Sequence, residues 1–187
     1  MPLPSSVARK HIHTRAIDYR GYQREDGLWD IEAHMTDKKT YDFKNNWRGA
    51  ISAGEPLHEM LLRVTIDNSF VIQDIIAVTD HSPFKMCPDI TPNYKDLIGI
   101  QMGRGWRKAI RSKVGGTAGC THLTELLFPM ATAAMQTIWP MLKHQQNKAD
   151  SDISSDNKRP FIIDTCHAWA SDSPEVKVNA PKFYTGD

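Results

Sequence analysis

The sequence has few cysteines and no paired-cysteine motif, which excludes two common kinds of site. Its 187 residues contain three cysteines, none of them in a C-x-x-C pair. Zinc ribbons and thioredoxin-like redox centres both need such a pair. A chain of this length can stabilise a core without disulfides. The cysteines are therefore expected to be free thiols, metal ligands or a nucleophile.

Other signals are absent as well. No apolar run is long enough to span a membrane, and residues 1–10 lack the apolar core of a secretory signal. We therefore expect a cytoplasmic protein with no membrane partner. The formal net charge is only +1, which argues against nucleic acid as a partner. No G-x-S-x-G, Walker A or dinucleotide-binding motif occurs.

The first half of the chain has the period-two alternation of antiparallel strands. Residues 27–35 place apolar side chains on one face, while the other face carries Asp30, Glu32 and His34. Such a polar face is usually solvated, with a metal site or proton relay as the alternative. Residues 37–39 are polar enough to turn the chain, and residues 40–43 are expected to return as a partner strand.

Residues 59–67 and 70–79 form the clearest predicted hairpin, with Asn68 and Ser69 as its turn. Both faces of this hairpin are partly apolar. We therefore expect the protein to cover it on both sides.

The second half favours helices at residues 93–98, 106–114 and 121–144, and Pro129 should kink or split the last of them. Strands followed by helices, without βαβ alternation, predict an α+β fold in which helices pack on one face of an antiparallel sheet.

The expected domain organisation has three parts. Residues 1–145 form a single α+β domain, and residues 146–159 are a polar linker. Residues 160–187 contain a short strand at 161–164 and a tail that packs back on the same domain.

The strongest sign of chemistry is the segment GGTAGCTHLTELL at residues 115–127. Its glycines lead to Cys120 at the start of a predicted helix, where free N–H groups and the helix dipole favour a thiolate. His122 follows two residues later. Cys120 and His122 are thus predicted to be a catalytic thiol and its base, or ligands of zinc or iron. The alternative is a small buried cysteine that only packs.

Two further cysteines have weaker contexts. Cys87 lies in the predicted loop 80–92 with His81, and both are expected to reach Cys120 or to be purely structural. Cys166 and His167 end the predicted strand at 161–164, where neighbouring side chains point to opposite faces. A packed cysteine beside an exposed histidine is the favoured interpretation there.

Four strings resemble a bacterial family catalogued as a domain of unknown function, DUF 2889. They are DGLWDIEAHMTD at 26–37, GEPLHEM at 54–60, GCTHL at 119–123 and DTCHA at 164–168. This resemblance covers nearly the whole chain and implies no activity.

The middle of the chain is also similar to iron–sulfur scaffold and sulfur-acceptor proteins of the IscU/NifU and SufE type. In those scaffolds a cysteine that opens the last helix is a cluster ligand, and Cys120 falls at that position. The other ligand positions fall near His58 and His81, so only one thiol matches. The resemblance implies a sulfur acceptor, or a metal site rebuilt with His58, His81 and Cys87.

Three functions follow as hypotheses. The leading one is a Cys/His site that binds zinc, iron or an iron–sulfur cluster, or carries sulfur, with metal ligands drawn from Cys120, His122, Cys87, His81 and His58. The second is a cysteine-dependent enzyme of acyl transfer or thioester hydrolysis, with Cys120 as the nucleophile and His122 or His34 as the base. The third is a binding or regulatory module without chemistry, with a protein partner or a second copy of the chain.

Overall fold

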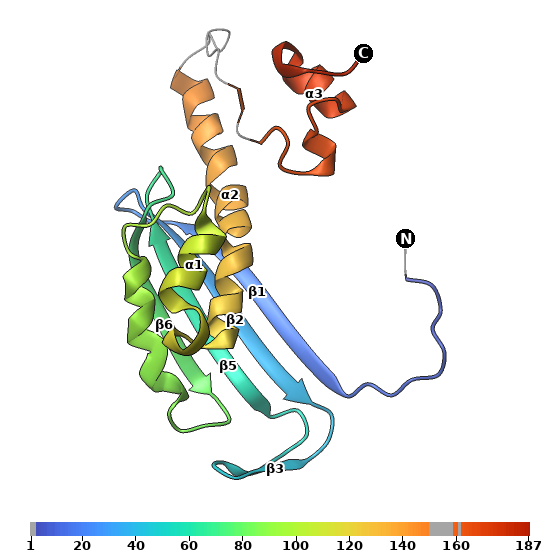
Figure 1. Ribbon diagram of the computed structural model, residues 1–187, viewed down its shortest axis with the longest axis vertical. Coiled ribbons are helices and arrows are strands. Elements are labelled where there is room, and N and C mark those ends of the chain that lie inside the picture. The colour runs from blue at the N-terminus through green and yellow to red at the C-terminus, as the bar shows by residue number, and fades with distance from the viewer. Residues whose placement is uncertain (1–2, 150–158, 161) are drawn as a thin grey trace. The chain divides into compact units, whose positions relative to one another are not determined.

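A four-stranded antiparallel sheet forms the framework of the computed structural model (Figure 1). Its strands lie in the order β1 (His13–Gln23), β2 (Trp29–Lys39), β5 (Pro56–Ile66) and β6 (Ile72–His81). A small separate hairpin pairs β3 (Phe43–Asn45) with β4 (Gly49–Ile51). The structure describes residues 3–149, 159–160 and 162–187, and the side chains of 143–149 are not among the described parts.

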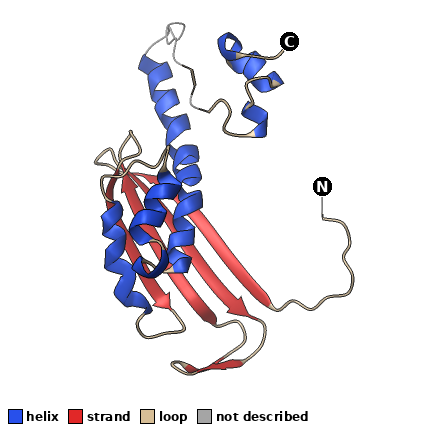
Figure 2. Ribbon diagram, viewed as in Figure 1, coloured by secondary structure: helices blue, strands red, loops and turns tan. Residues whose placement is uncertain are grey.

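Helices cover one face of this sheet, which confirms the predicted α+β class (Figure 2). They are the 3-10 helix η1 (Cys87–Leu97), α1 (Trp106–Val114) and the long α2 (Thr121–Ala149), with a short 3-10 turn η2 (Gly116–Ala118) between α1 and α2. Alternate residues of β2 and β5 point into this layer and are almost fully buried, as are apolar residues of α1 and α2. The core therefore lies between the helices and the sheet.

The hairpin and the helix at 106–114 are confirmed, the helix with the predicted bounds. The predicted turn at 37–39 is wrong, because β2 runs on to Lys39 and pairs with β1 on one side and β5 on the other. Residues 40–43 consequently do not return as its partner, and β3 pairs with β4 instead.

Two helix predictions also differ from the structure. The first predicted helix, at 93–98, overlaps the end of a longer 3-10 helix, η1, which begins at Cys87 and ends at Leu97. The third is one helix, α2, that continues through Pro129 and Pro140 without being split. No helix in the described ranges combines the length and the hydropathy that crossing a bilayer requires.

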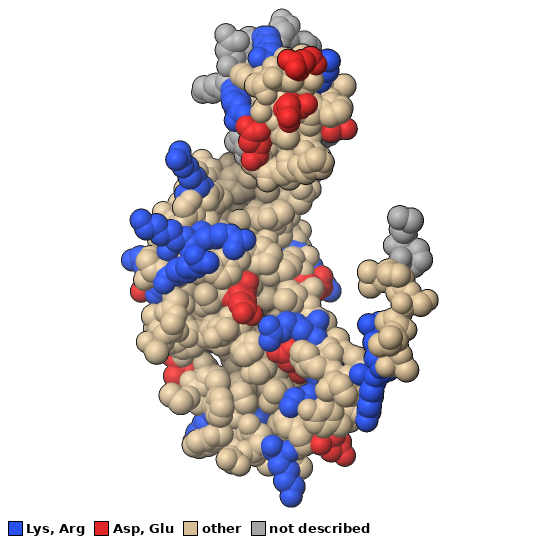
Figure 3. Space-filling view, turned by 45° about the vertical axis from the view of Figure 1, so that its right-hand side comes forward, with Lys and Arg blue, Asp and Glu red and all other residues tan. Residues whose placement is uncertain are grey.

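Within the first compact unit, Met1–His144, helices cover one side of the β5–β6 hairpin and leave the other side open. On the face away from the helices, Leu61, Ile76 and Val78 are 36%, 45% and 40% exposed. The expectation of cover on both sides is therefore not met by the elements of this unit. Basic side chains of α1 are exposed as well, and Figure 3 shows a group of Lys and Arg on the left of that view, with further basic side chains elsewhere on the same face.

The second compact unit spans Gln145–Asp187. It contains η3 (His167–Trp169), α3 (Pro174–Asn179) and η4 (Pro181–Phe183) around a small core of Ile163, Val176 and Ala180. Residues 162–164 form a turn rather than the predicted strand, and residue 161 lies outside the described residues, as does most of the predicted linker at 146–159. The return of residues 160–187 onto the first unit stays a prediction.

Candidate functional site

Strand register brings three polar residues into one row on the helix-covered face. Arg15 on β1 is paired with Asp37 on β2, and Asp37 with His58 on β5. Asp37 lies on the same face of β2 as the buried residues Trp29 and Met35, and its side chain is only 4% exposed. A carboxylate at such a position must be compensated by charge or hydrogen bonds.

Arg15 and His13 compensate the Asp37 carboxylate. Arg15 donates from Nε to Oδ1 at 2.9 Å and from Nη2 to Oδ2 at 2.8 Å, and His13 Nε2 lies 2.9 Å from Oδ1. Burial acts to raise the pKa of Asp37, but the hydrogen bonds and charge of Arg15 outweigh it and lower the pKa to about 2. Asp37 is therefore ionised at neutral pH.

Two histidines meet at the other side of this carboxylate. His58 Nδ1 lies 3.2 Å from Asp37 Oδ2, and His122 Nε2, from the first turn of α2, lies 3.8 Å from the same oxygen. The two imidazole rings are in contact, with centroids 3.9 Å apart. Together Asp37, His58 and His122 offer three ligand atoms that all lie within 4.8 Å of one another.

Both imidazoles are held in the neutral form. Burial, followed by the neighbouring His122, lowers the pKa of His58 to about 4. Burial, followed by the charge of Arg15, also lowers the pKa of His122. Nδ1 of His58 is buried and, despite its closeness to Asp37, lacks the alignment of a hydrogen bond. A buried polar atom without a hydrogen bond is uncommon and calls for an explanation.

Cys120 lies directly before α2, as a shared site with His122 requires. Its Sγ is 3.9 Å from His122 Nδ1 and 4.0 Å from Met60 Sδ. Its backbone N–H donates to the Tyr94 hydroxyl at 3.0 Å, which holds the start of α2 against η1. His122 therefore has Cys120 at one ring nitrogen and Asp37 at the other.

The other predicted site residues lie elsewhere. The extra residue Asp80 forms a bulge in the pairing of β5 and β6, and His81 is paired with Glu59, its Nδ1 3.0 Å from Glu59 Oε2. The Cys87 thiol makes no hydrogen bond within the described residues and is not part of the Asp37 cluster. Cys166 is exposed in the second unit, directly before η3.

The polar face of β2 is confirmed, and each of its residues has a partner on β5. Thr65 Oγ1 donates to Asp30 at 2.6 Å, Arg63 Nε donates to Glu32 at 2.7 Å, and His34 Nε2 lies 2.9 Å from Glu59 Oε1. These are the cross-strand pairs of an outward sheet face.

Sequence reasoning missed Asp37 and Arg15. The polar run at 37–39 predicts a turn at Asp37, although this residue continues the period-two series Trp29, Ile31, Ala33 and Met35. A carboxylate in phase with the apolar positions of a strand was the available signal. Arg15 had no comparable signal, because only the pairing of β1 with β2 brings it to Asp37.

Comparison with known proteins adds a family but no activity. A family model described as "Protein of unknown function (DUF2889)" matches residues 13–136. Neither the curated proteins nor the solved structures include a match to the chain. The matched span contains Arg15, Asp37, His58, Cys120 and His122. The likeness to IscU/NifU and SufE type proteins stays a prediction.

Proposed function

This chain belongs to the DUF2889 family, and since that membership assigns no activity, we propose from the geometry that the Asp37–His58–His122 cluster binds a divalent transition metal ion, with zinc the best fit. The observation that carries the proposal is the approach of three ligand atoms to within 4.8 Å of one another. Imidazole and carboxylate are common zinc ligands, and three protein ligands leave a fourth position for water or substrate.

The two distances from Asp37 suit an ion of this size. Zinc bonds of about 2.0–2.1 Å in a tetrahedron separate neighbouring ligand atoms by roughly 3.3 Å. Asp37 Oδ2 is 3.2 Å from His58 Nδ1 and 3.8 Å from His122 Nε2. A shift of His122 by a few tenths of an ångström would bring the second distance to the required value.

The protonation states also suit a metal. A metal-binding imidazole must be neutral, and the pKa values of His58 and His122 are both lowered. Asp37 supplies the negative charge, and His58 Nδ1 is a buried atom in need of a partner. Because Arg15 shares the Asp37 carboxylate, the ion is expected to exchange readily.

Cys120 has an outer role in this proposal. Its thiol is next to Nδ1 of His122, whereas the ion would bind Nε2. Metal-bound histidines usually donate their second N–H to a neighbouring acceptor that orients the ring. An iron–sulfur cofactor fits less well, since it needs several thiolates. Among the described residues, Cys120 is the sole cysteine beside Asp37, His58 and His122.

The test is a zinc titration of metal-free protein by competition with a chromophoric chelator. We expect one ion per chain. His58→Ala and His122→Ala should each weaken binding by more than the roughly 10- to 100-fold that loss of an outer-shell partner costs. His81→Ala is the matched control and should bind as wild type does. Absence of micromolar zinc binding, or equal binding in the His58 and His122 variants, would contradict the proposal.

A second function is favoured by one specific observation. Cys120 Sγ, the two nitrogens of His122 and Asp37 Oδ2 form a chain with separations of 3.9 and 3.8 Å. In an acyl-transfer or thioester-hydrolysing enzyme, Cys120 would be the nucleophile, His122 its base and Asp37 the group that orients His122.

Alkylation of metal-free protein by iodoacetamide at pH 7 tests this function. An enzyme thiol should react rapidly and stoichiometrically at Cys120, and His122→Ala should slow the reaction by about tenfold or more. A rate equal to that of the same thiol in the urea-unfolded chain would exclude it.

A further inference from the structure

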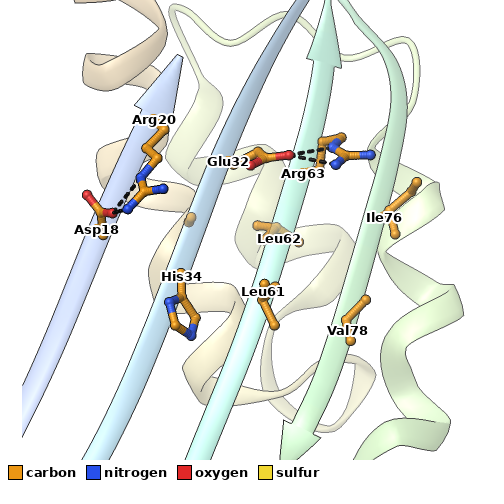
Figure 4. A pocket seen from close by; sticks show the side chains of 10 residues that line it. Asp18, Arg20, Glu32, His34, Leu61, Leu62, Arg63, Ile76 and Val78 are labelled. Atoms are coloured by element: carbon orange, nitrogen blue, oxygen red, sulfur yellow. Dashed lines mark hydrogen bonds and ion pairs between the residues drawn. The ribbon is translucent and has the colours of Figure 1, made fainter. Parts of the chain in front are cut away.

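The face of the sheet opposite the helices contains a hollow of about 390 Å³. Figure 4 shows its side chains: Leu61, Ile76 and Val78 from β5 and β6, His34 from β2, and ion pairs on the rim. This volume is within the range of about 300–1,000 Å³ that is usual for small-molecule sites. The Asp37 cluster, on the other face, contributes nothing to it.

We propose that this hollow binds a small neutral molecule with an apolar body of single-ring size and a hydroxyl group. The aliphatic side chains would contact the body, and His34 would accept a hydrogen bond from the hydroxyl. The inference is independent of the metal site.

The floor of the hollow is apolar where a solvated face would be polar. Leu61 and Val78 are directly paired across β5 and β6, and Ile76 is two residues from Val78 on the same face. All three are at least 36% exposed. Clustered exposed aliphatic side chains commonly mark a binding surface.

The rim carries charge, but the charges cancel in pairs. Arg20 Nε donates to Asp18 Oδ2 at 2.7 Å, and Arg63 Nε donates to Glu32 Oε1 at 2.7 Å. Each guanidinium therefore has a carboxylate beside it, as the dashed lines in Figure 4 show. Because these lining charges are paired and the Glu59 carboxylate lies beside His34, the hollow favours a neutral ligand over an organic anion.

Glu59 determines the hydrogen-bonding character of His34. His34 Nε2 and His81 Nδ1 lie 2.9 and 3.0 Å from the two carboxylate oxygens of Glu59, and a carboxylate accepts hydrogen bonds from such ring nitrogens. In the Nε2–H tautomer that this contact requires, His34 donates to Glu59 Oε1. Nδ1 has no partner among the described residues and is left as an acceptor, which selects a ligand that donates.

His81 completes the support of His34. Its Nδ1 lies 3.0 Å from the second oxygen of Glu59. It reaches this face because the bulge at Asp80 shifts the register between Glu59/His81 and Met60/Thr79. Bulges commonly redirect a side chain in this way near functional sites. Glu59 is thus held from both sides, and it keeps His34 in one orientation.

Protein-observed NMR of the full chain tests the inference with three probes: 4-ethylphenol, ethylbenzene and 4-ethylbenzoate. We expect 4-ethylphenol to shift amide signals of β2, β5 and β6 and to bind about 3- to 10-fold more tightly than ethylbenzene, as one hydrogen bond predicts. The charged 4-ethylbenzoate should bind more weakly than the phenol.

Variants separate the two contributions. His34→Ala should remove the preference for the phenol over ethylbenzene, and Val78→Lys should abolish binding of both. His11→Ala, in the arm before β1, is the matched control, and amide spectra report whether each variant is folded. The proposal is overturned if millimolar 4-ethylphenol shifts no signals on these strands, if 4-ethylbenzoate binds best, or if folded His34→Ala keeps the preference.

Discussion

His58 and Glu59 are consecutive residues of β5 that belong to two different clusters on opposite faces of the sheet. The His58 imidazole lies 3.2 Å from Asp37 on the helix-covered face, while the Glu59 carboxylate is held by His34 and His81 on the open face. Because successive side chains of a strand point to opposite faces, substitutions at the two positions can be used to test the two sites separately.

Stability should fall in acid because His58 is buried in its neutral form. Its pKa is lowered from 6.5 to about 4, so between these values the unfolded chain binds more protons than the folded one. The contribution of His58 is therefore complete above pH 6.5 and is lost as pH falls toward 4. The shift corresponds to at most about 3 kcal/mol.

Urea unfolding at pH 7.5 and pH 4.5 measures this effect. His58→Gln, which cannot be protonated, should lose less stability than wild type over that interval. An equal loss in the two proteins would show that His58 is not the group responsible.

Arg15→Met should strengthen zinc binding by several-fold, since it removes a cation that competes for Asp37. The same change leaves the buried carboxylate with fewer donors, so metal-free protein should lose about 1.5–3 kcal/mol of unfolding free energy. Chelator competition and thermal melts with and without zinc measure the two effects. Weaker zinc binding in a folded variant would mean that Arg15 orients Asp37 for the metal rather than competing with it.

Cys120→Ser should retain zinc binding with a loss of no more than about 10- to 100-fold, the range for an outer-shell partner. The reason is that the thiol faces Nδ1 of His122 and the proposed ion faces Nε2. The same titration with Cys87→Ser should match wild type. Complete loss of binding in folded Cys120→Ser would make Cys120 a direct ligand.

Gly21→Ala should destabilise the contact between β1 and α2. A Cβ at this position would lie 1.9 Å from Oγ1 of Thr137, and overpacking of this kind costs about 1–3 kcal/mol. Thr137→Ala in the Gly21→Ala background should recover most of the loss in a urea double-mutant cycle. Additive effects of the two substitutions would contradict the predicted contact.

The local elements of this protein could be predicted because neighbouring residues determine them. The hairpin of β5 and β6 follows from period-two alternation around Asn68 and Ser69, and α1 has the predicted bounds. Cys120 was placed correctly before α2, since the preceding glycines and the apolar periodicity after it are both local. His58 and His122 were also among the predicted metal ligands, and the structure brings these two together.

The sequence by itself thus determined the α+β class, the identity of most elements and the thiol–imidazole pair at the start of α2. Only the tertiary structure decided that Asp37 lies at the centre of the candidate cluster, because Arg15, Asp37 and His58 are about twenty residues apart in sequence and meet through strand register. It also decided that His81 belongs to the open face, since the extra residue Asp80 shifts the register and brings His81 opposite Glu59. Alternation predicts that a strand has two faces, whereas register and bulges determine which residues share one.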